Sequence, residues 1–367
     1  MLTRLYLNNF RCFVNFEYRP SSRKQLILGR NGSGKSSLLD ALLAIRQFAV
    51  NSDVDAFGIL GQRTRWLKEP RQTYELDANL EGGAYTYKLS IEPFGVPEQT
   101  RVLSEIVLLD GRPIFEFING EVQLYTDELE QYVAYPFDWH RSALNTIVPG
   151  KDNQKLIRFK SWLAGLFCFR IDPFSMYPRS EKEDYSPKVN LSNFASWYRH
   201  LLQTFPREND GLLKSLREAL DQFAYLKFET FGEDVRLLLA EFGEHNKSVK
   251  FYFRELSEGQ RSLICLYTIL HFVLERGQTV IVDEPENFIS LRELQPWLMA
   301  VTDSVDENRG QMFIISHHPE FINQWAPDYG IQLIREGTGP VRIANFESDP
   351  ESVLSPAELV ARSWEHE

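Results

Sequence analysis

The chain has 367 residues, of which 43% are hydrophobic and 25% charged. These values exclude a small disulfide-stabilised fold and an extensively disordered chain, because they suffice for one large or two ordinary domains with a real core. Asp and Glu total 51 against 40 Lys and Arg, a net charge of −11, so general attraction to nucleic acid or anionic lipid is not expected, although a local basic groove is compatible with this balance.

Two short alternating segments open the chain. Leu5 and Leu7 alternate with polar residues, and a second run covers 14–18. This pattern predicts two strands that form a hairpin beside the strand that follows. Arg11 lies between the two runs, where a cation either contacts a bound phosphate or faces solvent. Both interpretations stay open, and we keep Arg11 among the candidate nucleotide-binding residues.

The next segment carries a phosphate-binding pattern. Residues 25–28 are typical of a short buried strand and residues 36–45 of a helix, and the chain between them fits GxxxxGK[ST]. The matching residues are Gly29, Arg30, Asn31, Gly32, Ser33, Gly34, Lys35 and Ser36, followed by Ser37. Glycines let backbone N–H groups line a concave loop, and the helix N-terminus adds partial positive charge. We expect nucleotide phosphates here, with Lys35 on the β and γ phosphates and Ser36 on Mg²⁺.

A β-rich block follows. Residues 51–70 are expected to form a loop, since Gly58, Gly61 and Pro70 interrupt them. Alternating apolar residues then predict strands at 73–80, 85–91, 102–109, 113–118 and 121–124. Turn residues at 82–83 and 119–120 favour hairpins between them. The block is therefore expected to be an antiparallel sheet attached to the nucleotide-binding core.

The middle of the chain is mainly helical in pattern. Helices are expected at 127–134, 152–166, 190–204 and 210–223, with a short strand at 167–171. No sustained heptads appear, so a long coiled-coil arm is not expected. The mixed-charge run 179–188 reads either as a solvated loop or as a loop that contacts a partner or gates the site.

Strands expected at 234–240 and 249–253 lead into further motifs. The sequence Leu256-Ser257-Glu258-Gly259-Gln260 precedes a helical pattern that reaches Glu275. The β-branched run 279–282 is typical of a buried parallel strand and ends in Asp283-Glu284. A further core strand at 311–316 ends in His317-His318-Pro319, before strands at 329–335 and 341–346 and a helix that Ser355 opens.

Taken in order, these motifs resemble those of ABC-type P-loop ATPases. The opening Leu7-Asn8-Asn9-Phe10-Arg11, the Asp283-Glu284-Pro285-Glu286-Asn287 turn and Ser316-His317-His318-Pro319 are similar to the SMC/RecF/OLD branch, and more narrowly to stand-alone, AAA-labelled ATPases of bacterial anti-phage defence. The resemblance implies an α/β P-loop NTPase of ABC architecture, with a mixed or parallel core sheet, an antiparallel β-subdomain and an inserted helical subdomain. We divide the chain on this basis into 1–126, 127–224 and 225–367.

The resemblance also implies roles for single residues, with ATP and Mg²⁺ as cofactors. Asp283 would hold Mg²⁺ through water, Glu284 would be the general base, and Lys35 is also counted as catalytic. His317 would contact the γ-phosphate as the switch histidine, with the adjacent His318 as the alternative. Ser257, Glu258, Gly259 and Gln260 would form the signature motif that grips ATP bound to a second protomer. Glu258 stands where transporters carry glycine.

Two positions depart from the family pattern. Ser290 stands where transporters usually carry the D-loop aspartate, so coupling between protomers is expected to differ in detail. A Q-loop glutamine is not evident near 137–144, and His140 or Arg141 is the candidate substitute. These are the places where roles cannot be transferred from the family residue by residue.

The resemblance implies a head-to-tail, ATP-dependent homodimer that gates a separate effector, a nuclease or toxin, in anti-phage defence. The alternative is a RecF- or SMC-like repair ATPase that clamps DNA directly. A transporter subunit fits poorly, because about 220 residues separate the P-loop from the signature, and a non-hydrolysing scaffold conflicts with an intact Glu284. Three unpaired cysteines and the absence of a signal-like or membrane-spanning run predict a cytoplasmic protein without a membrane partner.

Overall fold

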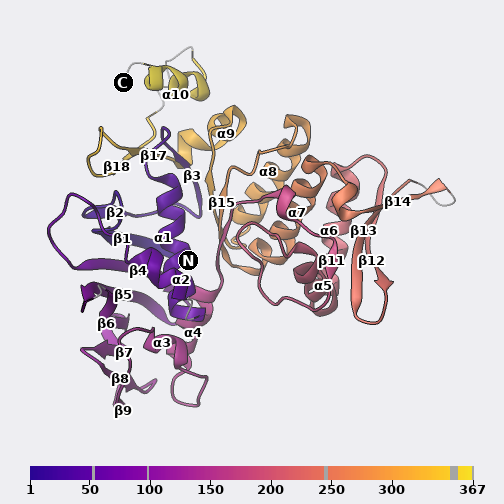
Figure 1. The fold of residues 1–367 in the computed structure, drawn as a ribbon. Coiled ribbons are helices and arrows are strands. Elements are labelled where there is room, and N and C mark those ends of the chain that lie inside the picture. The colour runs from indigo at the N-terminus through magenta and orange to yellow at the C-terminus, as the bar shows by residue number, and fades with distance from the viewer. Residues whose placement is uncertain (52–53, 97–98, 244–246, 348–353, 366–367) are drawn as a thin grey trace. The chain divides into compact units, whose positions relative to one another are not determined.

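A computed structural model describes residues 1–51, 54–96, 99–243, 247–347 and 354–365 (Figure 1). The chain forms two compact units. Unit 1 comprises 1–166 and 329–347, and unit 2 comprises 167–328 and 348–367. These limits differ from the three segments expected at 126/127 and 224/225. The reason is that the helices after residue 127 divide between the units. Helices α3 (Ala143–Thr146) and α4 (Gln154–Ala164) pack on α1 (Lys35–Asn51), whereas α5 (Phe194–Thr204) packs with β11 (Arg179–Ser180) and α6 (Pro206–Ala219) with β12 (Phe223–Phe231).

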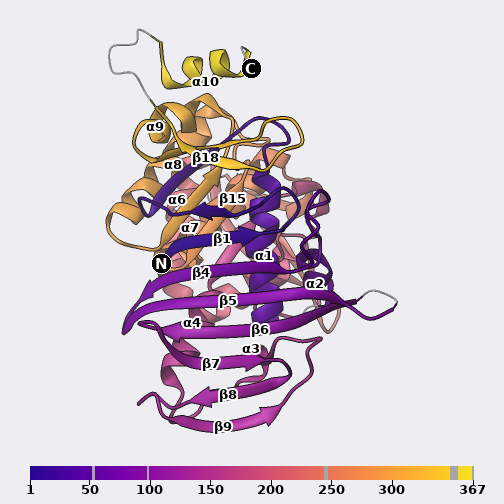
Figure 2. The ribbon, with the colours of Figure 1, turned by 90° about the vertical axis from the view of Figure 1, so that its left-hand side faces the viewer.

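Unit 1 contains an eight-stranded sheet in the order β2-β1-β4-β5-β6-β7-β8-β9, with every neighbouring pair antiparallel. The strands are β1 (Leu2–Asn8), β2 (Phe16–Tyr18), β4 (Gln72–Leu80), β5 (Gly83–Phe94), β6 (Gln99–Leu109), β7 (Arg112–Ile118), β8 (Glu121–Tyr125) and β9 (Gln131–Pro136). Buried and part-exposed residues alternate along β4 and β5, as expected for a sheet with one face against a core. Figure 2 looks onto this sheet, with α1 behind it.

The same unit holds the strand that leads into the P-loop. β3 (Lys24–Leu28) is buried throughout and pairs in parallel with β17 (Gly330–Ile334), which pairs antiparallel with β18 (Arg342–Asn345). The helices are α1 (Lys35–Asn51), α2 (Val54–Leu60), α3 (Ala143–Thr146) and α4 (Gln154–Ala164). The expected hairpin of the first two strands is confirmed, but it joins β4 in the large sheet and is not beside β3.

Unit 2 is built around a parallel pair and a layer of helices. β15 (Thr279–Asp283) and β16 (Gln311–Ile315) pair in parallel, and β10 (Leu166–Phe169) precedes them in the chain. The α-helices are α5 (Phe194–Thr204), α6 (Pro206–Ala219), α7 (Glu258–Phe272), α8 (Leu291–Asp306), α9 (Pro319–Tyr329) and α10 (Pro356–Glu365); short 3₁₀ turns cover Pro173–Ser175, Phe253–Glu255 and Leu274–Arg276. α7 is almost entirely buried, so it forms the centre of this unit.

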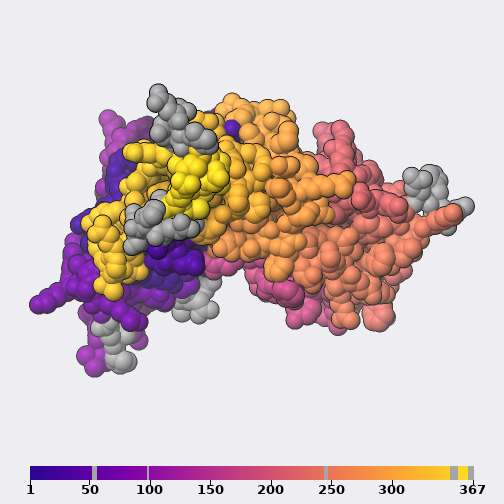
Figure 3. Space-filling model, turned by 90° about the horizontal axis from the view of Figure 1, so that it is seen from above, coloured from indigo at the N-terminus to yellow at the C-terminus, as the bar shows by residue number. Residues whose placement is uncertain are grey.

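Unit 2 also contains an antiparallel sheet, whose central strand is β13 (Val235–Phe242). On one side β13 pairs with β12 (Phe223–Phe231), and on the other it pairs with β11 (Arg179–Ser180) and β14 (Val249–Tyr252). β13 and β14 reach into a protrusion that the space-filling view shows in orange (Figure 3). No helix among the described residues is long and apolar enough to cross a membrane.

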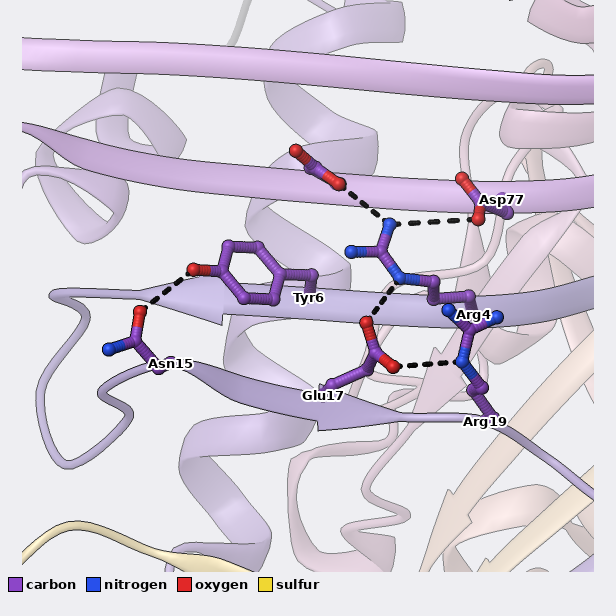
Figure 4. A network of polar contacts seen from close by, with 7 residues as sticks. Arg4, Tyr6, Asn15, Glu17, Arg19 and Asp77 are labelled. Carbon is purple, nitrogen blue, oxygen red and sulfur yellow. Dashed lines mark hydrogen bonds and ion pairs between the residues drawn. The ribbon is translucent and has the colours of Figure 1, made fainter. Parts of the chain in front are cut away.

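A network of charged groups joins β1, β2 and β4 on one face of the large sheet (Figure 4). Arg4 donates through Nε to Glu17 Oε2 at 2.7 Å and through Nη1 to Glu75 Oε2 at 2.6 Å, and it lies 3.6 Å from Asp77. Arg19 donates to the other oxygen of Glu17 at 2.8 Å. The hydrogen bonds from Arg4 and then Arg19 hold the pKa of Glu17 below its usual value. Arg4 of β1 therefore links β2 and β4 to β1 through its hydrogen bonds to Glu17 and Glu75.

Replacing Arg4 with methionine should lower the free energy of unfolding by about 1–2 kcal/mol at neutral pH, because two charge-assisted hydrogen bonds are lost. A group whose folded pKa is depressed stabilises the fold above its unfolded pKa, and that contribution fades as pH falls through the folded pKa. The difference between wild type and variant should therefore shrink in acid. Urea unfolding at several pH values measures it, and an equal difference at all pH values would contradict the role of the carboxylates.

Candidate functional site

The P-loop lies between β3 and α1, as the sequence predicts. The loop bends sharply at Gly29, whose φ is +152°, and a Cβ there would lie 2.5 Å from Ser33 Oγ and 2.7 Å from the carbonyl oxygen of Leu333. Lys35 donates from Nζ to the carbonyl oxygens of Gly29 at 2.6 Å and Arg30 at 3.1 Å, so its ammonium lies over the loop. The hydroxyl of Ser33 is buried and has no hydrogen-bond partner among the described residues. The loop thus combines a close-fitting turn with an unsatisfied polar atom.

Arg11 lies beside the first turn of α1. Its Nη1 donates to Asp40 Oδ2 at 2.6 Å and is 3.5 Å from Ser37 Oγ, while Nε donates to Gln62 Oε1 at 2.7 Å. Its backbone φ is +48°, and its guanidinium lies 5.2 Å from the centre of the Phe10 ring. Arg11 is therefore a fixed cation next to the helix that follows the P-loop.

A cavity of about 580 Å³ opens at this point of unit 1. It is lined by Arg11, Cys12, Ser37, Gln62, Arg63, Arg65, Trp66 and Arg335. Arg335 lies over the Trp66 ring at 5.8 Å and its Nη1 is 3.4 Å from the carbonyl oxygen of Gly32 in the P-loop. The cavity therefore offers four arginines and one indole ring directly beside the phosphate-binding loop.

Sequence reasoning missed most of this cavity. It placed 51–70 in a loop without a function, whereas the structure has α2 at 54–60 and directs Arg63, Arg65 and Trp66 to the cavity wall. The close spacing of Arg63, Arg65 and Trp66 was the available signal, because clusters of arginine with an aromatic residue are typical of surfaces that bind anionic or aromatic ligands. Arg335 gave no such signal, since it lies about 270 residues after Trp66 in the chain.

In unit 2, Asp283 and Glu284 end the buried strand β15. Asp283 accepts a hydrogen bond from Arg170 Nε at 2.9 Å. Glu284 is exposed and has a φ of +49°, its N–H donates to the carbonyl oxygen of Ile315 at 2.8 Å, and its Oε2 accepts from Asn287 Nδ2 at 3.0 Å. The turn therefore directs one carboxylate to solvent and holds it by an amide, a geometry that suits a base for a water molecule.

The loop after β16 is tied to the turn after β15. Ser316 donates from Oγ to Glu286 Oε1 at 2.6 Å and accepts from the His318 N–H at 2.9 Å, while His318 Nδ1 accepts from the Glu320 N–H at 3.2 Å. Burial raises the pKa of Glu286. His317, the expected switch histidine, is half-buried at this junction. The loops that follow β15 and β16 are thus held against each other by the hydrogen bond from Ser316 to Glu286.

Ser257 begins α7 and forms a reciprocal cap with Gln260. Ser257 Oγ accepts from the Gln260 N–H at 3.2 Å, and Gln260 Oε1 accepts from the Ser257 N–H at 3.0 Å. Gly259 packs against the chain after β15, since a Cβ there would lie 2.5 Å from the carbonyl oxygen of Phe288. Glu258 accepts from Arg261 Nη2 at 3.1 Å. The expected signature residues therefore lie together at the N-terminus of a 15-residue helix.

The two departures from the family pattern have local partners. Ser290 caps α8 through Glu293. His140 and Arg141 are exposed and pair with Asp138 at 2.8 Å and 3.8 Å, and neither lines the cavity. Their role as a Q-loop substitute stays a prediction.

The residues expected to hold Mg²⁺ have suitable chemistry. Ser36 supplies a hydroxyl and Asp283 a carboxylate, and hard oxygen ligands are those that Mg²⁺ prefers. Asp283 already accommodates a positive group, the guanidinium of Arg170. The described residues contain no cluster of three or more His, Cys, Asp or Glu that could hold a metal ion on its own. Mg²⁺ commonly needs only one or two such protein ligands, because phosphates and water supply the others.

Two protein-family models match the chain. Residues 26–323 match the family model described as AAA domain, putative AbiEii toxin, type IV TA system, and residues 2–46 match the P-loop containing region of an AAA domain. Curated proteins gave no match. Among solved structures, an SMC head bound to the C-terminal winged-helix domain of ScpA is similar at 11% identity and a TM-score of 0.57, covering 94% of this chain and 98% of the other. The SMC head domain from Thermotoga maritima has 14% identity and a TM-score of 0.48, with coverages of 95% and 99%.

Proposed function

We propose that this chain, which belongs to the AAA-domain family described as putative AbiEii toxin, type IV TA system, is a cytoplasmic, Mg²⁺-dependent ATPase. In this proposal, its ATP-bound homodimer controls a separate effector in anti-phage defence. Family membership and the SMC-head fold supply the P-loop ATPase part of this statement. The observation that best supports nucleotide binding is the arginine-rich cavity beside the P-loop.

The cavity suits the rest of a nucleotide once the P-loop holds its phosphates. Trp66 is 44% exposed and lines the wall, so a purine base can stack on its indole ring. Arg335 lies over the same ring and also contacts the P-loop, which supports an arrangement with its positive charge between the base and the phosphates. Arg11 adds a second cation at the first turn of α1. We infer that the base and ribose occupy this cavity.

Replacing Trp66 with alanine should weaken binding of a fluorescent ATP analogue about tenfold, since stacking of a base on an aromatic side chain contributes about 1–3 kcal/mol. Tyr132 is the matched control, because it is an aromatic residue of the same unit, 67% exposed and outside the cavity. Equal affinities of Trp66→Ala and Tyr132→Ala would place the base elsewhere. Binding of inorganic triphosphate should be much less affected than binding of ATP.

The chemistry we propose assigns each residue a separate task. Lys35 and the loop N–H groups bind and neutralise the phosphates, and Ser36 and Asp283 hold Mg²⁺, which supplies further charge neutralisation when bound. Glu284 orients the attacking water and accepts its proton. His317 contacts the γ-phosphate and Ser316 holds that loop against Glu286. The assignment of one nucleotide to residues of both units rests on family membership and on the order of the motifs.

The signature motif supports dimerisation. The N-terminus of α7 presents Ser257 and Gly259, and a helix N-terminus of this length favours a phosphate oxygen. In ABC-type ATPases, this motif grips ATP held by the other protomer's P-loop. We therefore propose a head-to-tail dimer that closes on two ATP molecules and reopens after hydrolysis, so that its open and closed states can switch an effector.

We propose that the effector is a nuclease or toxin encoded separately. The family description, AAA domain, putative AbiEii toxin, type IV TA system, supports a role in such a system but names no separate effector. A DNA clamp is the rival role. Filter binding with ATP over a salt series separates the two, because a protein that neutralises several phosphates loses DNA affinity steeply as salt rises. Tight, salt-sensitive binding of DNA would favour the clamp, whereas co-purification of a nuclease or toxin without DNA would favour the switch.

A further inference from the structure

Asp283 pairs with a cation that belongs to the chain itself. Arg170 directly follows β10, and its Nε lies 2.9 Å from Asp283 Oδ2. The side chain of Asp283 is 11% exposed, whereas that of Arg170 is 47% exposed. The carboxylate is thus fixed at the end of a buried strand, and the guanidinium is the partner that can move into solvent.

The backbone of Arg170 is held in place. Its N–H donates to the carbonyl oxygen of Val189 at 2.8 Å, and two residues later the Asp172 N–H donates to the carbonyl oxygen of Asn190 at 3.3 Å. Asp172 also accepts through Oδ1 from the Phe174 N–H at 3.0 Å, which caps the turn Pro173–Ser175. Movement of Arg170 away from Asp283 is therefore a rotation of one long side chain, with the main chain unchanged.

We propose, on the premise that the chain binds Mg²⁺ with ATP as inferred above, that Arg170 is a resident cation that Mg²⁺ displaces from Asp283. The guanidinium and Mg²⁺ compete for the same carboxylate, because two positive groups on one carboxylate repel each other. Arg170 keeps Asp283 neutralised until Mg²⁺ arrives and raises the Mg²⁺ concentration that nucleotide binding requires.

The test is a Mg²⁺ titration of nucleotide binding, with a fluorescent, non-hydrolysable ATP analogue and no measurement of turnover. Arg170→Gln should lower the half-saturating Mg²⁺ concentration about two- to fivefold, the range expected for loss of one part-exposed ion pair. Arg170→Lys keeps the charge and should stay closer to wild type. Arg309→Gln is the matched control, because Arg309 is 51% exposed and pairs with Glu307 at 2.8 Å in the same unit.

The outcomes separate this inference from the function on which it rests. If wild type fails to bind the analogue even at saturating Mg²⁺, the proposed nucleotide site is wrong. If wild type binds but Arg170→Gln has an unchanged Mg²⁺ requirement, Arg170 does not compete for Asp283. A higher Mg²⁺ requirement in Arg170→Gln would also overturn the competition, since Arg170 would then orient Asp283 for the metal. Thermal melting of each variant verifies that unit 2 is folded.

Discussion

Glu284→Gln should reduce steady-state phosphate release by about 10²- to 10⁴-fold while leaving ATP binding intact, because the amide keeps the shape of the side chain but cannot accept the proton of the attacking water. Asn287 should still contact the amide oxygen at this position, since it donates to Glu284 Oε2 in the wild type. Phosphate release and binding of a fluorescent ATP analogue are measured on the same preparation.

The same variant also tests dimerisation. Size-exclusion chromatography in ATP and Mg²⁺ should shift Glu284→Gln to the dimer volume, because the closed state forms but is not consumed by hydrolysis. Glu307→Gln is the control, since Glu307 is an exposed carboxylate on the same unit that pairs with Arg309. If Glu284→Gln binds ATP but stays monomeric, the proposed head-to-tail dimer is wrong. If its phosphate release is undiminished, Glu284 is not the base.

Lys35→Ala should weaken ATP binding by about 30-fold or more. Truncating one partner of a buried, charge-assisted contact costs about 2–5 kcal/mol, and Lys35 is the ammonium group that lies over the P-loop. Isothermal titration with ATP in Mg²⁺ measures the loss. Lys88→Ala removes a charge from the same unit outside the cavity and should bind as wild type. If Lys35→Ala keeps wild-type affinity, the loop does not hold the phosphates.

The fold class and the family were open to prediction from the sequence. The resemblance to P-loop ATPases of the SMC-like branch is confirmed by the family matches and by the SMC-head fold, and the antiparallel β-subdomain is present. These features could be found because each motif is contiguous. The P-loop joins a strand to a helix within a dozen residues, and Gly29 and Gly34 have positive φ and close neighbours that a Cβ would meet.

The errors arise where tertiary pairing overrides a short pattern. A helix expected at 127–134 is wrong, because residues 131–136 form β9 and pair with β8 at the edge of the sheet. Tyr132, Val133 and Tyr135 favour a strand, and only the neighbouring β8 decides between the two outcomes. The cavity was missed for a related reason, since Trp66 and Arg335 meet only in three dimensions.

One segment of unit 2 has two attachment points three residues apart. Arg170 holds Asp283, and the carbonyl oxygen of Pro173 accepts a buried hydrogen bond from Arg261 at 2.6 Å, while the same guanidinium holds Glu258. The segment therefore connects Asp283, the carboxylate that we propose holds Mg²⁺, to the first turn of α7. If Mg²⁺ displaces Arg170 as proposed, the Asp283 end of this connection would be lost, while the hydrogen bond from Arg261 to Pro173 would still hold the segment against the helix whose N-terminus we propose contacts a second copy.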